Sequence, residues 1–313
     1  MRRAFLRFAW LLPAILLAGR AFGDEDPREA ERRFRFLLAR GEELQAQSAD
    51  LGPGASGAEE ARMAALRRRL ENDYRHFLSD HPQHSRAMVA FGSLLYDQGR
   101  EAEGIGWWER AIKVDPREAY AYNNIANHDG HNGRAAEALK LYDKAIALEP
   151  AEPVFRFNWA TTCVVFRNEA HAVYGWTTGE IYRHCLEQFR KARDLAPQDF
   201  ELATAYAQTF YQMPQPDWQE AYQAWKSCLD QPLTDEQRQF VYANLARTGL
   251  NSGRYDEAEQ WTAKLTNDGK GSIRRALERR IAERRKTLGP AAMTNSPTPA
   301  ATGAGGKRPD PSP

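Results

Sequence analysis

Three prolines in the middle of the chain are separated by a constant interval. Pro82, Pro116 and Pro150 lie 34 residues apart, and Pro197 follows after 47 residues, which is 34 plus 13. Each proline ends a similar phrase, of which residues 145–150, AIALEP, are an example. A fixed period of this length predicts an array of two-helix units that stack on one another, because one such unit cannot bury its own apolar face.

The residues inside one period favour two closely packed helices. When the terminal proline is numbered 32, unit 119–152 places Ala126 at position 8, Ala138 at position 20 and Tyr142 at position 24. Small side chains let the two helices approach, and the aromatic ring fills the gap beside them. Gly133 permits the turn between the helices, and the proline ends the second helix because it has no amide hydrogen to donate.

These residues resemble the tetratricopeptide-repeat (TPR) family. Unit 119–152 matches the family pattern at Tyr122, Ile125, Ala126, Gly133, Ala138, Tyr142 and Ala145. Unit 85–118 matches it at Gly92, Gly99, Gly104, Trp108 and Ala111. The resemblance covers about residues 60–285 and does not assign a subfamily. It implies an all-α fold, a right-handed α-solenoid of stacked helical hairpins that ends in a capping helix.

We expect five segments along the chain. They are a signal peptide at 1–23, N-terminal helices with a degenerate repeat at 24–84, the TPR array at 85–268, a capping helix at 269–286 and a disordered tail at 287–313. Unit 153–199 carries an insertion at about 166–178, where Thr177 and Glu180 predict a capping box at the start of its second helix. The apolar residues of the capping helix are predicted to share one face: Ile273, Leu277 and Ile281.

Both ends of the chain are predicted to lie outside the fold. Arg2, Arg3 and Arg7 precede a short apolar run at 8–18, which is typical of a secretory signal. Cleavage is expected before Asp24 or, as an alternative, after Ala21. The protein is therefore expected to be exported, most simply to a periplasm, by the Sec or the twin-arginine route. The tail is rich in Pro and Gly and has too few apolar residues to bury a core.

The charge balance and the motifs argue against several functions. Lys plus Arg is 43 and Asp plus Glu is 42, so the net charge of +1 does not predict nucleic-acid binding. The chain contains no His-Glu-x-x-His, Gly-x-Ser-x-Gly or phosphate-loop motif. We therefore predict that the protein is not an enzyme, uses no cofactor and has no small-molecule substrate. In the segment that follows the predicted signal, no transmembrane segment is expected.

One group of polar residues leaves an alternative open. His128, Asp129 and His131 lie in the turn of one unit, and His171 is expected on the same edge one repeat along. Three imidazoles and a carboxylate form a plausible set of ligands for a first-row metal. These four residues are weak metal candidates, and the alternative function is a metal-binding or enzyme-accessory protein that uses this edge.

The three cysteines fall at inward-facing repeat positions. Cys163, Cys185 and Cys228 are expected to fill helix contacts as small buried residues. In an oxidising compartment Cys163 and Cys185 would be able to pair across one hairpin, and the sequence leaves this question open.

The resemblance implies that a partner binds the concave side, which the first helix of each hairpin lines. The residues projected there and proposed to contact a partner are Tyr96, Asn123, Asn124, Asn127, Asn158, Thr161, Gln208, Tyr211, Asn244 and Arg247. Asn recurs at position 6 as Asn124, Asn158 and Asn244. An amide offers a donor and an acceptor to an extended backbone, so the expected partner is a peptide or protein. The alternative is that some of these amides bond within the array.

Overall fold

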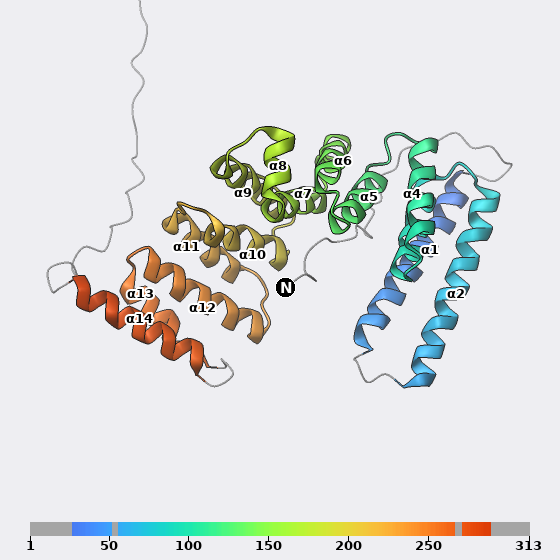
Figure 1. The fold of residues 1–313 in the computed structure, drawn as a ribbon. Coiled ribbons are helices and arrows are strands. Elements are labelled where there is room, and N and C mark those ends of the chain that lie inside the picture. Colours follow the sequence, from blue (N-terminus) through green and yellow to red (C-terminus); the bar gives the residue numbers. More distant parts are fainter. Residues whose placement is uncertain (1–26, 52–55, 267–270, 289–313) are drawn as a thin grey trace, which may run out of the picture. The chain divides into compact units, whose positions relative to one another are not determined.

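The structure is a computed structural model that describes residues 27–51, 56–266 and 271–288 (Figure 1). The predicted signal peptide and residues 289–313 of the predicted tail lie outside these residues. Every secondary-structure element in these residues is a helix, which confirms the all-α class. No helix in the described ranges has the length and apolar content that a membrane crossing requires.

The chain divides into two compact units, the first ending at Leu202 and the second beginning at Ala203. The helices of the first unit are α1 (Pro27–Asp50), α2 (Gly57–Asp80), α3 (Ser85–Asp97), α4 (Glu101–Val114), α5 (Ala119–His131), α6 (Ala135–Leu148), α7 (Pro153–Val165), α8 (Arg167–Tyr174) and α9 (Thr178–Leu195). The boundary falls inside α10 (Phe200–Thr209). The second unit continues with η1 (Phe210–Gln212), α11 (Trp218–Ser227), η2 (Cys228–Asp230), α12 (Asp235–Asn251), α13 (Tyr255–Ala263) and α14 (Ser272–Leu288).

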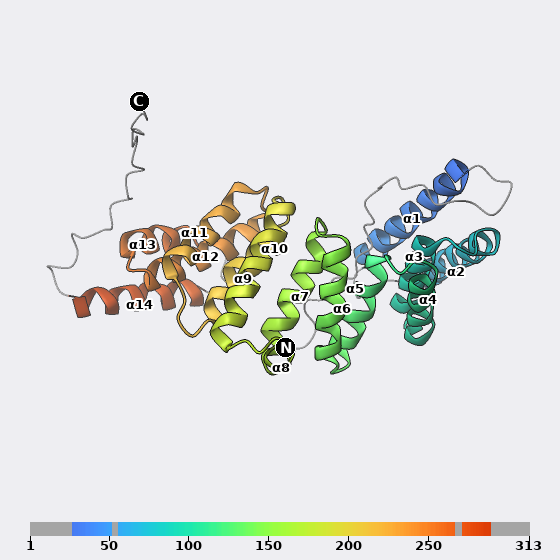
Figure 2. The same ribbon diagram turned by 90° about the horizontal axis from the view of Figure 1, so that it is seen from above.

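Consecutive helices pair as antiparallel hairpins in the register that the proline period predicts. In the first unit α1 packs on α2, α3 on α4, α5 on α6, and α7 on α9; in the second, α12 packs on α13 (Figure 2). The turn glycines Gly99, Gly133 and Gly253 have φ of 78°, 78° and 79°. This left-handed conformation favours glycine, because a Cβ atom is strained there.

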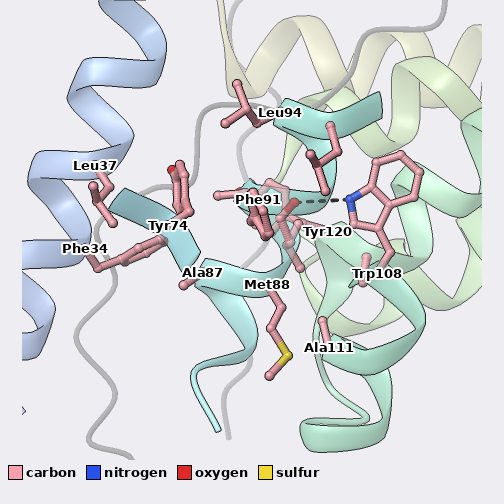
Figure 3. Packing of buried hydrophobic residues seen from close by; sticks show 14 of the residues in the cluster. Phe34, Leu37, Tyr74, Ala87, Met88, Phe91, Leu94, Trp108, Ala111 and Tyr120 are labelled. Atoms are coloured by element: carbon pink, nitrogen blue, oxygen red, sulfur yellow. Dashed lines mark hydrogen bonds between the residues drawn. The ribbon is translucent and has the colours of Figure 1, made fainter. Parts of the chain in front are cut away.

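The core of the first three hairpins is continuous from α1 to α5. Phe34 of α1 lies 6.1 Å from Phe77 of α2, and Tyr74 stacks on Phe91 of α3 at 5.7 Å between ring centroids (Figure 3). Trp108 is fully buried and its indole N–H donates to the carbonyl oxygen of Val89 at 3.1 Å. The long α1–α2 hairpin lies in the segment where a degenerate repeat is predicted, and the bulky Phe77 is buried where the pattern has a small residue.

Two glycines set the spacing of the α3–α4 hairpin. A Cβ atom at Gly104 would lie 2.6 Å from the carbonyl oxygen of Gly92, and a Cβ atom at Gly92 would lie 2.8 Å from the indole of Trp108. The corresponding positions of the α5–α6 hairpin hold Ala126 and Ala138, both fully buried. Side-chain size at these positions therefore fixes how closely each pair of helices approaches.

The insertion at 166–178 contains a short helix, α8, where only an extended turn was expected. The C-cap residue of α8 is Gly175, with φ of 72°. The predicted capping box of Thr177 and Glu180 then starts α9. Tyr174 links α8 to two helices, because its hydroxyl donates to Asp143 at 2.7 Å and accepts from the indole of Trp159 at 2.9 Å. The insertion is thus anchored on α6 and α7.

The capping helix α14 packs on α12 and α13 through one apolar face. Leu277 and Ile281 are buried, whereas Ile273, on the same face one turn earlier, is 48% exposed. Ile273 lies in the first turn, before the helix meets the unit. The helix also continues to Leu288, two residues past its predicted end.

Candidate functional site

Buried polar side chains connect the first helices of three successive hairpins. Asn158 of α7 donates to the amide oxygen of Asn123 at 3.0 Å, and Asn123 of α5 donates to Asn124 at 3.2 Å. Asn124 in turn donates to the hydroxyl of Ser93 on α3 at 3.0 Å. We call these four residues the amide ladder. Because each step joins side chains held by packed helices, the ladder fixes the relative position of α3, α5 and α7.

Four asparagines of the first unit were predicted to contact a partner, and all four are buried in its interior. Asn123, Asn124, Asn127 and Asn158 are each 0% exposed. Asn127 accepts from the buried hydroxyl of Tyr142 at 2.6 Å. The geometry therefore matches the second interpretation, in which these amides bond within the array. Asn123 and Asn124 each use one of two amide hydrogens in the ladder. That any of the four also contacts a partner stays a prediction.

Replacing Asn123 by Ala is expected to lower the free energy of unfolding by about 2 kcal/mol, because it removes two buried hydrogen bonds. Chemical denaturation followed by circular dichroism measures the loss. Asn168→Ala, at an exposed position of α8, is the matched control and should change the value by less than about 0.5 kcal/mol. Equal stability of the two variants would contradict a structural role for the ladder.

Two other predicted residues of the first unit are half-buried. Tyr96 packs on Trp108 at 5.1 Å, and its hydroxyl lies 3.1 Å from Nδ1 of His128. Burial, with smaller contributions from Glu101 and Asp97, raises the pKa of Tyr96 to about 12. The hydroxyl is therefore protonated at neutral pH. Thr161 is half-buried on α7, three residues beyond the ladder residue Asn158.

The proposed metal edge does not assemble in the described residues. Asp129 pairs with Arg134, with a hydrogen bond of 3.0 Å from Nε. Nδ1 of His131 lies 2.8 Å from the carbonyl oxygen of Asn127, and Nδ1 of His171 lies 2.8 Å from that of Trp176. Among residues 27–51, 56–266 and 271–288, no three His, Cys, Asp or Glu side chains are grouped as metal ligands. No contact here favours the metal-binding alternative.

In the second unit, three predicted residues come together. The hydroxyl of Tyr211 donates to the amide oxygen of Asn244 at 3.1 Å, and the guanidinium of Arg247 lies 5.2 Å from the centre of the Tyr211 ring. Arg247 and Gln208 are exposed, whereas Tyr211 is half-buried. Burial raises the pKa of Tyr211, so its hydroxyl remains a donor. We call these three residues, together with the exposed Gln208 that lies three residues before Tyr211 in the chain, the α10–α12 cluster.

The cluster combines a cation, an amide and an aromatic ring. Arg247 offers fixed N–H donors that suit carbonyl and carboxylate oxygens, and Gln208 offers both a donor and an acceptor. Asn244, which is 7% exposed, orients Tyr211 from α12 and donates to the carbonyl oxygen of Phe240 at 2.9 Å. The arrangement is suited to hydrogen bonding with a peptide.

Neither a family profile nor a curated protein matches the chain. Solved structures do. PilF from Pseudomonas aeruginosa is similar with a TM-score of 0.53 at 14% identity, over 82% of this chain and 99% of that one. PilW, described as a widely conserved type IV pilus biogenesis factor, gives 0.51 at 13% identity over 81% and 100%. YrrB, described as a TPR protein with an unusual peptide-binding site, gives 0.51 at 14% identity over 66% and 97%.

The chain has the TPR fold. The hairpins, the small residues at their contacts and the left-handed turn glycines occur at the TPR positions predicted from the proline period. Identities of 13–14% establish the fold alone, so what the similar TPR structures bind is not transferred to this chain on their account.

A further feature of the TPR array was missed in the sequence. Glu118 and Glu152 each end a 34-residue unit, and a repeated acid at position 34 was the available signal. Glu118 accepts from the hydroxyl of Ser85 at 2.8 Å, and Glu152 accepts from that of Tyr120 at 2.6 Å. Glu118 is buried, and this burial raises its pKa from 4.5 to about 7. The two acids join the starts of successive first helices.

The three cysteines of the TPR hairpins are buried free thiols, as expected for residues that fill helix contacts. Burial raises the pKa of the Cys163 thiol, with the neighbouring Cys185 as a second cause. The neutral thiol is therefore the stable form at neutral pH. The pairing of Cys163 with Cys185 in an oxidising compartment stays a prediction.

Proposed function

We propose that this chain is an exported, non-catalytic TPR scaffold that binds a peptide segment or a protein surface. The observation that carries the proposal is the α10–α12 cluster. Tyr211 and Arg247 come from different repeats, yet they meet over the buried Asn244, and the exposed Gln208 lies three residues before Tyr211 in the chain. Hydrogen-bond donors and acceptors spaced along a rigid face suit an extended backbone.

The first unit supports the same function through its rigidity. The amide ladder holds α3, α5 and α7 at fixed spacing, and Tyr96 and Thr161 lie beside it with part of their surface exposed. A face whose helices are already positioned loses little conformational entropy when a partner binds. We therefore propose Tyr96 and Thr161 as contacts, with the asparagines mainly positioning the helices that carry them.

Export rests on the sequence of residues 1–23. A basic start followed by a short apolar run indicates a secretory signal, and the proposed location is the periplasm. N-terminal sequencing of the protein recovered from the envelope fraction tests this proposal. A mature N-terminus at Asp24 or at Phe22 supports it, whereas an intact N-terminus on protein from the cytosol contradicts it.

Replacing Gln208 and Arg247 by Ala is expected to weaken partner binding roughly tenfold or more. Each hydrogen bond lost at a desolvated contact costs about 0.5–1.5 kcal/mol, so the loss of two approaches a factor of ten in affinity. The partner is recovered by affinity capture from the envelope fraction, and its affinity for the variant is then measured by titration.

Lys226→Ala is the matched control, because Lys226 is an exposed cation on α11 of the same unit. It should retain full affinity. Folded Gln208→Ala/Arg247→Ala protein with undiminished affinity would remove the α10–α12 cluster from the binding surface. A parallel test of Asn127→Ala/Asn158→Ala then examines the first unit, with circular dichroism to separate lost binding from lost folding.

A further inference from the structure

The outward side of α14 carries a concentration of positive charge. The helix contains seven Lys and Arg residues and two Glu residues. Two of the bases are neutralised locally. Arg274 pairs with Glu278 at 2.9 Å, and Arg285 binds Asp256 at 2.5 Å and Glu259 at 3.1 Å, which ties α14 to α13.

Three further bases lie at exposed positions of the helix. Arg279, Arg280 and Lys286 are exposed, and no acidic side chain in the described ranges lies within ion-pair distance of them. We call these three residues the α14 basic face. Leu277 and Ile281, on the other side of the helix, are buried against the unit. Figures 1 and 2 both show α14 beside α13.

This distribution differs from that of the rest of the chain. The predicted mature segment has 39 bases and 42 acids, because residues 1–23 contain four of the 43 bases and no acid. Its net charge is therefore −3, and the excess of positive charge on α14 is local. A 17-residue helix spans about 25 Å, which spreads the basic side chains over an extended surface.

We propose that the α14 basic face binds the anionic phospholipid headgroups of a membrane surface. Charge complementarity supplies the attraction, at roughly a fivefold gain in affinity per base close to an anionic bilayer. The binding is peripheral, with the helix lying flat on the headgroups.

The composition of the helix favours lipid over nucleic acid. α14 has no aromatic residue on which a base can stack and no Asn or Gln that can read a base edge. Its cations are guanidinium and ammonium groups, which bind phosphates without reading a base. This proposal concerns a different surface from the α10–α12 cluster and does not depend on the partner bound there.

The test is co-sedimentation of the full chain with vesicles of phosphatidylcholine alone or of equimolar phosphatidylcholine and phosphatidylglycerol. The triple variant Arg279→Gln/Arg280→Gln/Lys286→Gln removes three charges while keeping good helix-forming residues. We expect the wild-type chain to prefer the anionic vesicles and the variant to lose roughly 100-fold in partitioning to them. Salt on the order of 0.5 M should abolish the preference by screening.

The matched control is Lys140→Gln/Arg190→Gln/Lys226→Gln, which removes the same charge from exposed positions on α6, α9 and α11. It should bind anionic vesicles like the wild type. All proteins share residues 1–23, so any difference reports on the substituted helices. Equal binding by the α14 variant and the wild type would overturn the proposal. The assignment to lipid would be overturned if the wild type bound a random DNA duplex as tightly as it binds anionic vesicles and the α14 variant lost that binding.

Discussion

Gly104→Ala is expected to lower the free energy of unfolding of the first unit by about 1 kcal/mol. A Cβ atom there would lie 2.6 Å from the carbonyl oxygen of Gly92 and 2.9 Å from Cβ of Tyr96, so α3 and α4 must separate. Overpacking of this kind costs about 1–3 kcal/mol. The better helix propensity of Ala returns up to about 1 kcal/mol, which is too little to reverse the sign.

Gly106 provides the matched control in the same helix. A Cβ atom at Gly106 meets nothing within 4 Å, so Gly106→Ala should raise the free energy of unfolding by about 0.5–1 kcal/mol through propensity alone. Urea denaturation of the two variants and the wild type measures both changes. We expect Gly104→Ala to lower the free energy of unfolding and Gly106→Ala to raise it. Stabilisation by both would show that the α3–α4 contact is looser than the structure describes.

Glu118→Gln is expected to stabilise the protein at pH 8 and to have little effect at pH 4. Burial raises the folded-state pKa of Glu118 from 4.5 to about 7, with Asp115 and Glu149 adding to the shift and the Ser85 hydroxyl and Arg86 opposing it. The folded state therefore binds the proton more tightly than the unfolded state. Stability falls as pH rises from about 4.5 to 7, by about 3 kcal/mol in total.

Glutamine resembles the protonated acid and retains an acceptor for the Ser85 hydroxyl, so the variant should lose this pH dependence. Denaturation at pH 4 and pH 8 gives the difference for each protein. Glu137→Gln, at an exposed position of α6, is the control and should change stability by less than about 0.5 kcal/mol at either pH. If the free energy of unfolding of Glu118→Gln falls between pH 4 and pH 8 as much as that of the wild type, the pH dependence comes from other groups.

The hairpins were predictable because their determinants are local and periodic. Ala126, Ala138 and Gly133 recur at positions where small size or a left-handed φ is required, and Thr177 caps α9 through residues within one turn. The insertion was harder to predict. It lies outside the period, and α8 is anchored by Trp159 and Asp143, which are 15 and 31 residues from Tyr174.

The candidate site was predicted in part. Projection of the repeat placed Tyr211, Asn244 and Arg247 on one face, and these residues do meet. The same projection placed Asn123 and Asn158 on the predicted concave side, where both are buried and bonded to each other. Period alone gives the direction of a side chain, but exposure depends on how closely the neighbouring helices pack.

By itself, the sequence determined the repeat length, the hairpin register and the turn positions, because prolines, glycines and small residues act on their immediate neighbours. The tertiary structure decided which polar residues bond together. Residues 93, 123, 124 and 158 form one ladder only when three helices are stacked at contact distance. It also decided that Ile273 is exposed while Leu277 and Ile281 are buried, because the place where α14 meets the unit depends on the surface formed by α12 and α13.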